Sequence, residues 1–216
     1  MSDSGLFITF EGGEGAGKTT LINRLAASLT DQGKKVITTR EPGGTAEAES
    51  IRNLLVQRDG GKWSPLSEVL LLFAARSLHI ERVIAPALSK GHIVISDRFT
   101  DSTMAYQGYG RGMDLQKIRD INDVVTDNLT PDLTFILDVD VRIGLARSQK
   151  RLSTEQGYNS TEDRFERMDL TFHEALRNGF LDIAKAQPER CHVINAEESL
   201  DDMFNSIQKI IEKQYV

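Results

Sequence analysis

The chain has 216 residues, of which 39% are hydrophobic and 27% charged, and its formal net charge is −6 at pH 7. This composition excludes a disordered chain, and the negative charge argues against a nucleic acid as the main partner. The sequence contains no apolar run near the roughly 20 residues that span a membrane, and its start lacks the basic flank of a signal peptide. Because its single cysteine, Cys191, can form no internal disulfide, we expect a soluble cytoplasmic protein.

An apolar run that begins at Leu6 ends in glycines and continues at once as a helix. Residues 12–19 fit the pattern G-x-x-x-x-G-K-[ST] of phosphate-binding loops, although a glycine-rich turn that happens to carry a lysine is the simpler alternative. Its glycines allow positive φ and close approach of backbone N–H groups to an anion, and the helix that opens at Gly17 adds the positive end of its dipole. We therefore predict an ATP site formed by Gly12, Gly13, Glu14, Gly15, Ala16, Gly17, Lys18, Thr19 and Thr20. Lys18 is expected on the β/γ-phosphates and the Thr19 hydroxyl on Mg²⁺.

The rest of the chain alternates strands and helices. We expect further strands at 35–39, 91–97, 131–138 and 191–195. Four expected helices run from Gly17 to Gly33, over 47–56, from Ser64 to about Lys90 and from Asp114 to about Asp127. A fifth begins at Val141, a sixth follows Arg167 and ends at about Ala186, and a last one covers the C-terminal residues. This alternation without an internal repeat predicts one α/β domain over 1–216, with a five-stranded parallel sheet and helices on both faces.

Polar residues follow two of the expected strands. Arg40 begins a Pro/Gly-rich loop after one strand, and Asp97 and Arg98 end the next. Because ligands bind at the carboxyl ends of parallel strands, Asp97 is a candidate metal or water ligand and Arg98 a candidate phosphate ligand, with a surface ion pair between them as the alternative. The following segment, 100–112, carries side chains suited to reading a small polar molecule: Ser102, Thr103, Tyr106, Gln107 and Arg111.

Six cations surround a polar stretch at 152–163 that has no apolar period: Arg142, Arg147, Lys150, Arg151, Arg164 and Arg167. A solvated basic helix face is one interpretation. A mobile lid at about 147–165, whose Arg147, Arg151 and Arg164 stabilise a transferring phosphoryl group, is the other. The helix at 64–90 is also too apolar for one narrow buried stripe, so part of it is expected to face a ligand or a second subunit unless it is fully buried.

Basic and polar groups beyond the expected γ-phosphate favour a nucleotide kinase over a hydrolase, which needs only water there. Five segments carry a resemblance to thymidylate kinase in its bacterial form, which extends from about residue 5 to 215: 11–19, 40–45, 73–76, Asp97–Arg98 and 105–108. The resemblance implies phosphorylation of dTMP to dTDP with ATP and Mg²⁺ by a homodimer. It places Arg40 and Arg98 on the dTMP phosphate, Arg76 and Gln107 on the thymine edges, and Phe73 in a stack on the base. Glu14 would lie near the sugar 3′-hydroxyl, and Tyr106 would crowd the 2′ position.

Two other functions stay open at this point. Another P-loop nucleoside monophosphate kinase with a different base specificity would carry many of the same groups. A nucleotide-dependent switch protein would normally contain an Asn-Lys-x-Asp segment that reads guanine, and this sequence has none.

Overall fold

The computed structural model describes residues 5–57, 61–155 and 164–215. Its centre is a five-stranded sheet with the order β2-β3-β1-β4-β5. All paired strands are parallel. The strands are β1 (Leu6–Gly12), β2 (Val36–Arg40), β3 (Ile93–Asp97), β4 (Leu133–Asp138) and β5 (Cys191–Asn195). The predicted sheet is confirmed, and β1 lies at its middle, so the loop that follows β1 opens at the centre of one sheet edge.

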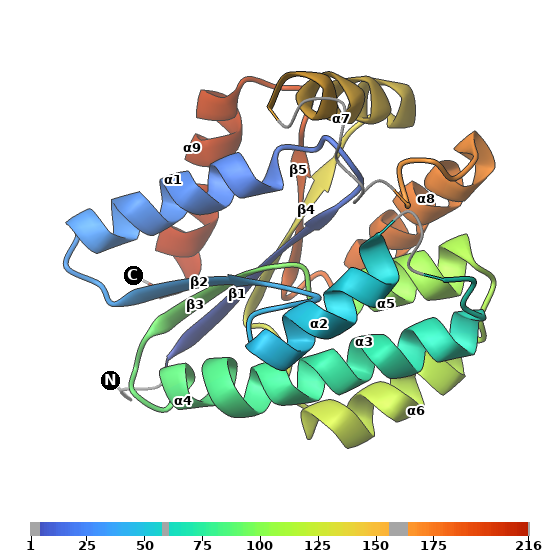
Figure 1. Ribbon diagram of the computed structural model, residues 1–216. Helices are drawn as coiled ribbons and strands as arrows, with labels where there is room; N and C mark the ends of the chain where they lie inside the picture. The colour runs from blue at the N-terminus through green and yellow to red at the C-terminus, as the bar shows by residue number, and fades with distance from the viewer. Residues whose placement is uncertain (1–4, 58–60, 156–163, 216) are drawn as a thin grey trace.

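Helices cover both faces of the sheet (Figure 1). On one side lie α1 (Lys18–Asp31) and α9 (Leu200–Tyr215), with α7 (Val141–Glu155) near the end of β4. The other side carries α3 (Pro65–His79), α4 (Ala85–Leu88), α5 (Thr100–Thr103) and α8 (Leu170–Ala186), with α2 (Ala46–Val56) and α6 (Leu115–Thr126) packed on α3. Among the described residues, no helix is long and apolar enough to cross a membrane.

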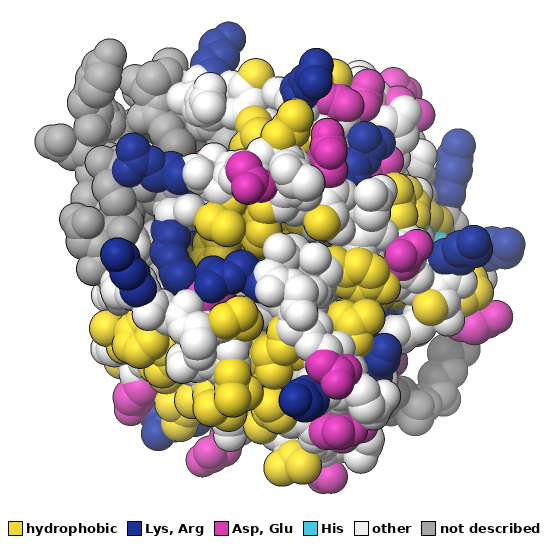
Figure 2. Space-filling view, turned by 90° about the vertical axis from the view of Figure 1, so that its right-hand side faces the viewer, with side chains coloured by type: hydrophobic (Ala, Val, Ile, Leu, Met, Phe, Trp, Pro, Cys, Tyr) yellow, Lys and Arg dark blue, Asp and Glu magenta, His cyan; other side chains and the backbone are white. Residues whose placement is uncertain are grey.

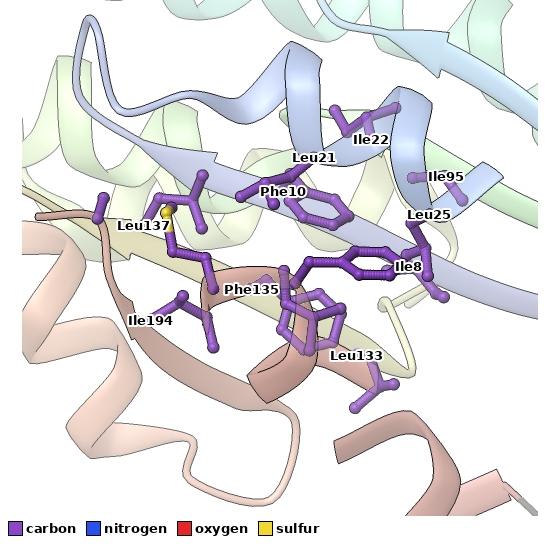
Figure 3. Packing of buried hydrophobic residues seen from close by; sticks show 14 of the residues in the cluster. Ile8, Phe10, Leu21, Ile22, Leu25, Ile95, Leu133, Phe135, Leu137 and Ile194 are labelled. Atoms are coloured by element: carbon purple, nitrogen blue, oxygen red, sulfur yellow. The ribbon is translucent and has the colours of Figure 1, made fainter. Parts of the chain in front are cut away.

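The largest hydrophobic core lies between the sheet and the α1/α9 layer (Figure 3). Phe10 and Phe135 from neighbouring strands meet with ring centroids 5.3 Å apart. Leu21 and Leu25 of α1 are buried against them, as the helical spacing predicts. Each such side chain, once removed from water, contributes about 1.5–3 kcal/mol, so this core fixes α1 and with it the loop that α1 begins from.

The long apolar helix predicted from Ser64 to about Lys90 is continuous but not regular. Ser64 caps its start, since its hydroxyl accepts from the Ser67 N–H at 3.2 Å, and Pro65 occupies the first turn. After α3 the backbone passes through a π-helical segment, η1 (Ile80–Ile84), and ends in α4. The segment predicted as a short polar helix likewise divides into α5 and a second π-helical segment, η2 (Met104–Gly110). Such π-turns often mark functional sites.

The predicted lid lies only partly within the described residues. Its first residues, 147–155, belong to α7, which therefore extends beyond the point where the sequence loses its apolar period. Residues 164–167 form a turn before α8, and 156–163 lie outside the described part of the chain.

Candidate active site

The phosphate loop connects β1 to α1 and depends on three of its glycines. Gly12, Gly15 and Gly17 have φ values of 131°, 67° and 93°. A Cβ on Gly15 would lie 2.0 Å from the carbonyl oxygen of Gly144 in α7, and one on Gly12 would lie 2.5 Å from that of Leu137 in β4. Positive φ was expected at Gly13 also, but the structure does not have it there. The glycines thus allow the loop to pack directly on the backbone of β4 and α7.

Lys18 points back into this loop. Its Nζ donates to the carbonyl oxygens of Gly12 and Gly13, each at 3.0 Å. Burial, reinforced by the charge of Arg98, lowers the pKa of the lysine, while Asp97 and Glu14 oppose that shift. Burial and the neighbouring arginine thus disfavour the charged form of Lys18, and an anion bound at the loop would stabilise the ammonium.

A cavity of about 990 Å³ lies in front of the loop and is lined by its residues 14–20 together with Arg40, Asp97 and Arg147. Within it the Thr19 hydroxyl approaches the Asp97 carboxylate, with 3.4 Å between Oγ1 and Oδ2. The described residues hold no cluster of three or more metal-binding side chains. One hydroxyl and one carboxylate are nevertheless the protein oxygens that Mg²⁺ typically uses when phosphate oxygens and water complete its shell, so this pair fits the ion.

Arg98 connects this cavity to a second one. It has a left-handed backbone (φ 74°), which turns its side chain back toward the phosphate loop. Nη1 donates to the Gly12 carbonyl at 3.0 Å and to the Ser102 hydroxyl at 3.1 Å, and Nη2 lies 3.2 Å from Oε1 of Glu14. Burial disfavours ionisation of Glu14, but Arg98 and Lys18 outweigh it and lower the pKa of that carboxyl to about 2. A fixed ion pair thus stands between the two cavities.

The second cavity, of about 140 Å³, lies between α3, α5 and η2 and includes Glu14, Arg76, Arg98, Tyr106 and Gln107 in its lining. Figure 2 shows Lys and Arg side chains gathered around a hollow on one face of the molecule. Glu14 and Arg98 line both cavities. Glu41, Arg52 and Glu166 also line both, so the two cavities adjoin along a shared wall that includes the Arg98–Glu14 pair.

In the second cavity, Nη1 of Arg76 and Oε1 of Gln107 are buried polar atoms that have no hydrogen-bond partner. The rest of the Arg76 guanidinium is held firmly, because Nε donates to Glu41 at 2.7 Å and Nη2 to the Phe99 carbonyl at 3.1 Å. Since buried polar groups are rarely left unpaired, the free donor and free acceptor indicate the polar edge of a bound ligand.

Other predicted residues line this cavity but use their polar atoms on the protein. The Ser102 hydroxyl donates to the buried carboxylate of Glu11, and the Thr103 hydroxyl accepts from Nη2 of Arg76 at 3.0 Å. The Tyr106 hydroxyl donates to Glu14, and its ring lies 4.9 Å from the guanidinium carbon of Arg98. These side chains shape the cavity and hold the two arginines.

Phe73 is not at the cavity, contrary to the stacking role that the resemblance implied. It is 2% exposed and packs with Val69 and Ile118, while its ring supports the Arg76 guanidinium at 4.7 Å. Leu72, one residue earlier, lines the cavity instead. One residue turns a helix by about 100°, so Phe73 faces the core and Leu72 faces the cavity.

The structure separates the predicted lid arginines. Arg147 lines the larger cavity and donates to the Ala196 carbonyl at 2.8 Å. Arg164 instead lines the smaller cavity, where it donates to the Leu55 carbonyl at 2.9 Å and pairs with Glu68. The Arg151 side chain lies outside the described part of the structure. Arg147 and Arg164 therefore serve different cavities.

Arg40 lines the larger cavity and is paired with Glu49 at 3.0 Å. Sequence reasoning missed several residues of the smaller cavity's lining, among them Arg52 of α2 and Phe165. Arg52 could have been found, since it occupies the inward face between Ala48 and Leu55, where a charged residue is unusual. Phe165 gives no comparable signal, because its place opposite Tyr106, with ring centroids 5.2 Å apart, depends on tertiary packing.

Comparison with known proteins identifies the family. The family model described as "Thymidylate kinase" matches residues 10–207. The thymidylate kinase of Caulobacter vibrioides is 47% identical over 207 residues, which is 96% of each chain, and that of Geobacter sulfurreducens is 44% identical with the same coverage. The crystal structure of thymidylate kinase from Ehrlichia chaffeensis superposes with a TM-score of 0.77 at 39% identity and covers 97% of this chain and 99% of that one. The chain therefore belongs to the thymidylate kinase family.

Proposed function

We propose that this chain transfers the γ-phosphoryl group of ATP to dTMP, giving ADP and dTDP, with Mg²⁺. The observation that carries this proposal is the meeting of the two cavities at Arg98 and Glu14. The larger cavity begins at the phosphate loop and takes the donor. The smaller one, with its unpaired polar atoms, takes the acceptor.

The donor phosphates bind the loop N–H groups and Lys18, which stabilise negative charge as it develops on the transferring group. Thr19 and Asp97 would hold Mg²⁺, which neutralises phosphate charge when bound. Of the lid arginines whose side chains the structure describes, Arg147 is the one that lines the donor cavity, from which it reaches the transferring group. Because the acceptor phosphate is already ionised, the reaction needs no general base.

On the acceptor side, Arg98 binds the dTMP phosphate and holds it in line with the donor. Arg40 contacts the same phosphate from the larger cavity, which it lines. Arg76 offers Nη1 to a carbonyl of thymine, and Gln107 offers Oε1 to the ring N–H. Leu72 supplies the apolar contact with the base. Tyr106, held by Glu14, excludes a 2′-hydroxyl by its bulk, and Glu14 lies near the 3′-hydroxyl.

A coupled ADP-release assay with dTMP, dUMP, dGMP and dCMP tests the proposal. We expect dTMP to give the highest kcat/KM. Similar values for all four would favour a kinase of different base specificity. A slow ATPase that no monophosphate stimulates would favour a nucleotide switch instead.

We further propose that the enzyme is a homodimer that acts in the cytoplasm. Leu66, Leu70 and Val124, on α3 and α6, are 50%, 53% and 84% exposed. A second copy packed on these helices would cover them. Sedimentation of Leu70→Glu tests the dimer: we expect a monomer, and an unchanged dimer would exclude this face. The cytoplasmic assignment is supported by the supply of ATP there and by the free, buried thiol of Cys191, whose pKa burial raises to about 12.

A further inference from the structure

Glu68 is a fully buried carboxylate that stands behind the acceptor cavity without lining it. Its Oε1 accepts from Nη1 of Arg111 at 3.0 Å and from Nη2 of Arg164. Its Oε2 accepts from Nε2 of Gln107 at 3.2 Å. The two oxygens thus have separate partners: one binds two guanidinium groups, and the other binds a residue of the cavity wall.

Both arginines are themselves anchored. Arg111 also donates to the Trp63 carbonyl at 3.2 Å, and Arg164 also donates to the Leu55 carbonyl at 2.9 Å. Buried charges keep such positions because a lost partner leaves an uncompensated charge in the interior. The carboxylate of Glu68 is therefore a fixed point on which Gln107 is held.

A carboxylate only accepts hydrogen bonds, so the Gln107 amide must turn its NH₂ group toward Glu68. Its carbonyl oxygen then points elsewhere, and this atom is the buried Oε1 that has no partner. Without Glu68, nothing in this contact would distinguish the two orientations of the amide, and rotation by 180° would present N–H groups to the ligand.

Gln107 Oε1 and Arg76 Nη1 offer an acceptor and a donor from the same cavity. Thymine and uracil carry the complementary edge, a ring N–H beside a carbonyl. Cytosine carries the opposite one, an unprotonated ring nitrogen beside an amino group. The orientation of one amide therefore decides which pyrimidine edge the cavity accepts.

We propose that Glu68 is a positioning residue for base selection, which fixes Gln107 with its carbonyl oxygen toward the base and thereby favours thymine and uracil over cytosine. The inference rests on the proposed function, since it assumes that this cavity takes the acceptor base. Glu68 does not separate thymine from uracil, because both bases present the same edge.

The test replaces Glu68 with a side chain of the same shape that both donates and accepts. In Glu68→Gln we measure kcat/KM and KM for dTMP and dUMP, KM for ATP, and the dissociation constant of dCMP by competition. Glu81→Gln, an exposed carboxylate in η1, is the matched control. We expect KM for dTMP and dUMP to rise about tenfold, dCMP binding to stay within threefold or to tighten, and KM for ATP to stay unchanged.

Loss of stability does not imitate this result, because a smaller folded fraction lowers every rate equally and leaves the ratio of dTMP to dCMP affinity unchanged. An unchanged ratio in Glu68→Gln overturns the proposal. A double-mutant cycle adds a second criterion: in the Gln107→Leu background, Glu68→Gln should change KM for dTMP less than twofold, because the residue through which it acts is gone. An equal effect in both backgrounds contradicts the proposed route.

If Glu68→Gln does not fold, Glu68→Asp keeps the anion for the two arginines and moves it one methylene away from Gln107. We expect the same fall in the ratio of the affinity for dTMP to that for dCMP, and a ratio equal to that of the wild type would contradict the proposal. Wild-type enzyme without dTMP-dependent ADP release would instead refute the proposed function, so the two failures are distinguishable.

Discussion

Replacing Arg98 tests the junction of the two cavities, because this side chain contacts the phosphate loop, Glu14 and Ser102 at once. Arg98→Ala removes the guanidinium and leaves the Glu14 carboxylate without its arginine partner. We expect the acceptor phosphate to lose its main positive ligand. The donor site, held by Lys18 and the loop, should keep its affinity.

The magnitude follows from the contacts that are lost. Hydrogen bonds to charged groups contribute about 1.5–3 kcal/mol each, and Arg98 can offer its phosphate partner at least one of them. Because Arg98 also holds the acceptor in line, we take about 3 kcal/mol for its removal, which lowers kcat/KM for dTMP about 100-fold.

Arg98→Gly separates activity from stability. Arg98 has a φ of 74°, a conformation that costs a non-glycine residue about 1–2 kcal/mol and that glycine adopts freely. Both variants lack the guanidinium, so their kcat/KM values should agree within about threefold. The glycine variant should be about 1 kcal/mol more stable to urea than the alanine variant.

Steady-state ADP release with varied dTMP at saturating ATP measures the effect, with Arg119→Ala, an exposed arginine of α6, as the control. A kcat/KM for Arg98→Ala within fivefold of wild type would refute the placement of the acceptor phosphate at this residue. A rise in KM for ATP with no change for dTMP would move Arg98 to the donor site.

Four further substitutions test other parts of the site. Lys18→Ala should lower kcat/KM at least ~100-fold by loss of charge stabilisation in steady-state assays, and near-normal turnover would exclude the loop as the donor site. Arg164→Ala should raise KM for dTMP more than it lowers kcat, because the guanidinium lies at the acceptor cavity; a pure kcat effect would return it to the transferring group. Burial and, to a smaller extent, the charge of Asp101 raise the pKa of Glu11 from 4.5 to about 8, so the free energy of unfolding should fall as pH rises from about 5 to 8. Urea titrations at several pH values should show a smaller fall for Glu11→Gln, and an equal fall in both proteins would contradict the pKa shift. Gly144→Ala places a Cβ 2.5 Å from the carbonyl oxygen of Glu14 and should lower Tm and raise KM for ATP. Unchanged values would mean that the phosphate loop can move away from this Cβ without losing stability or affinity for ATP.

The sequence allowed the sheet and the loop between β1 and α1 to be predicted because both depend on local signals. Residues 12–19 specify a turn between a strand and a helix, and the apolar strands specify a buried parallel sheet. The meeting of Thr19 with Asp97 then follows from topology alone, since β1 and β3 are neighbours and both end at the same edge.

The lining of the smaller cavity could be predicted only in part. Arg76, Gln107 and Tyr106 do line it, but the difference between Phe73 and Leu72 is one position on a helix, and the family resemblance suggested the aromatic residue. Arg164 was placed with the transferring group because of its charge and its neighbours in the chain. Its partner Glu68 lies 96 residues away in the sequence, so no local pattern could predict that contact.

Carboxylates from different elements hold the polar side chains that line the smaller cavity; Glu41 and Glu68 are buried and Glu14 is half-buried. Glu41 holds Arg76, Glu68 holds Gln107, and Glu14 holds Arg98. A carboxylate in the interior is costly unless it is paired, so each pair fixes the orientation of the side chain that meets the substrate. Because these side chains are ordered during folding, the entropy lost in ordering them does not reduce the affinity for the substrate. In the proposed mechanism, selectivity for the acceptor base would therefore depend as much on residues behind the cavity wall as on those that touch the base.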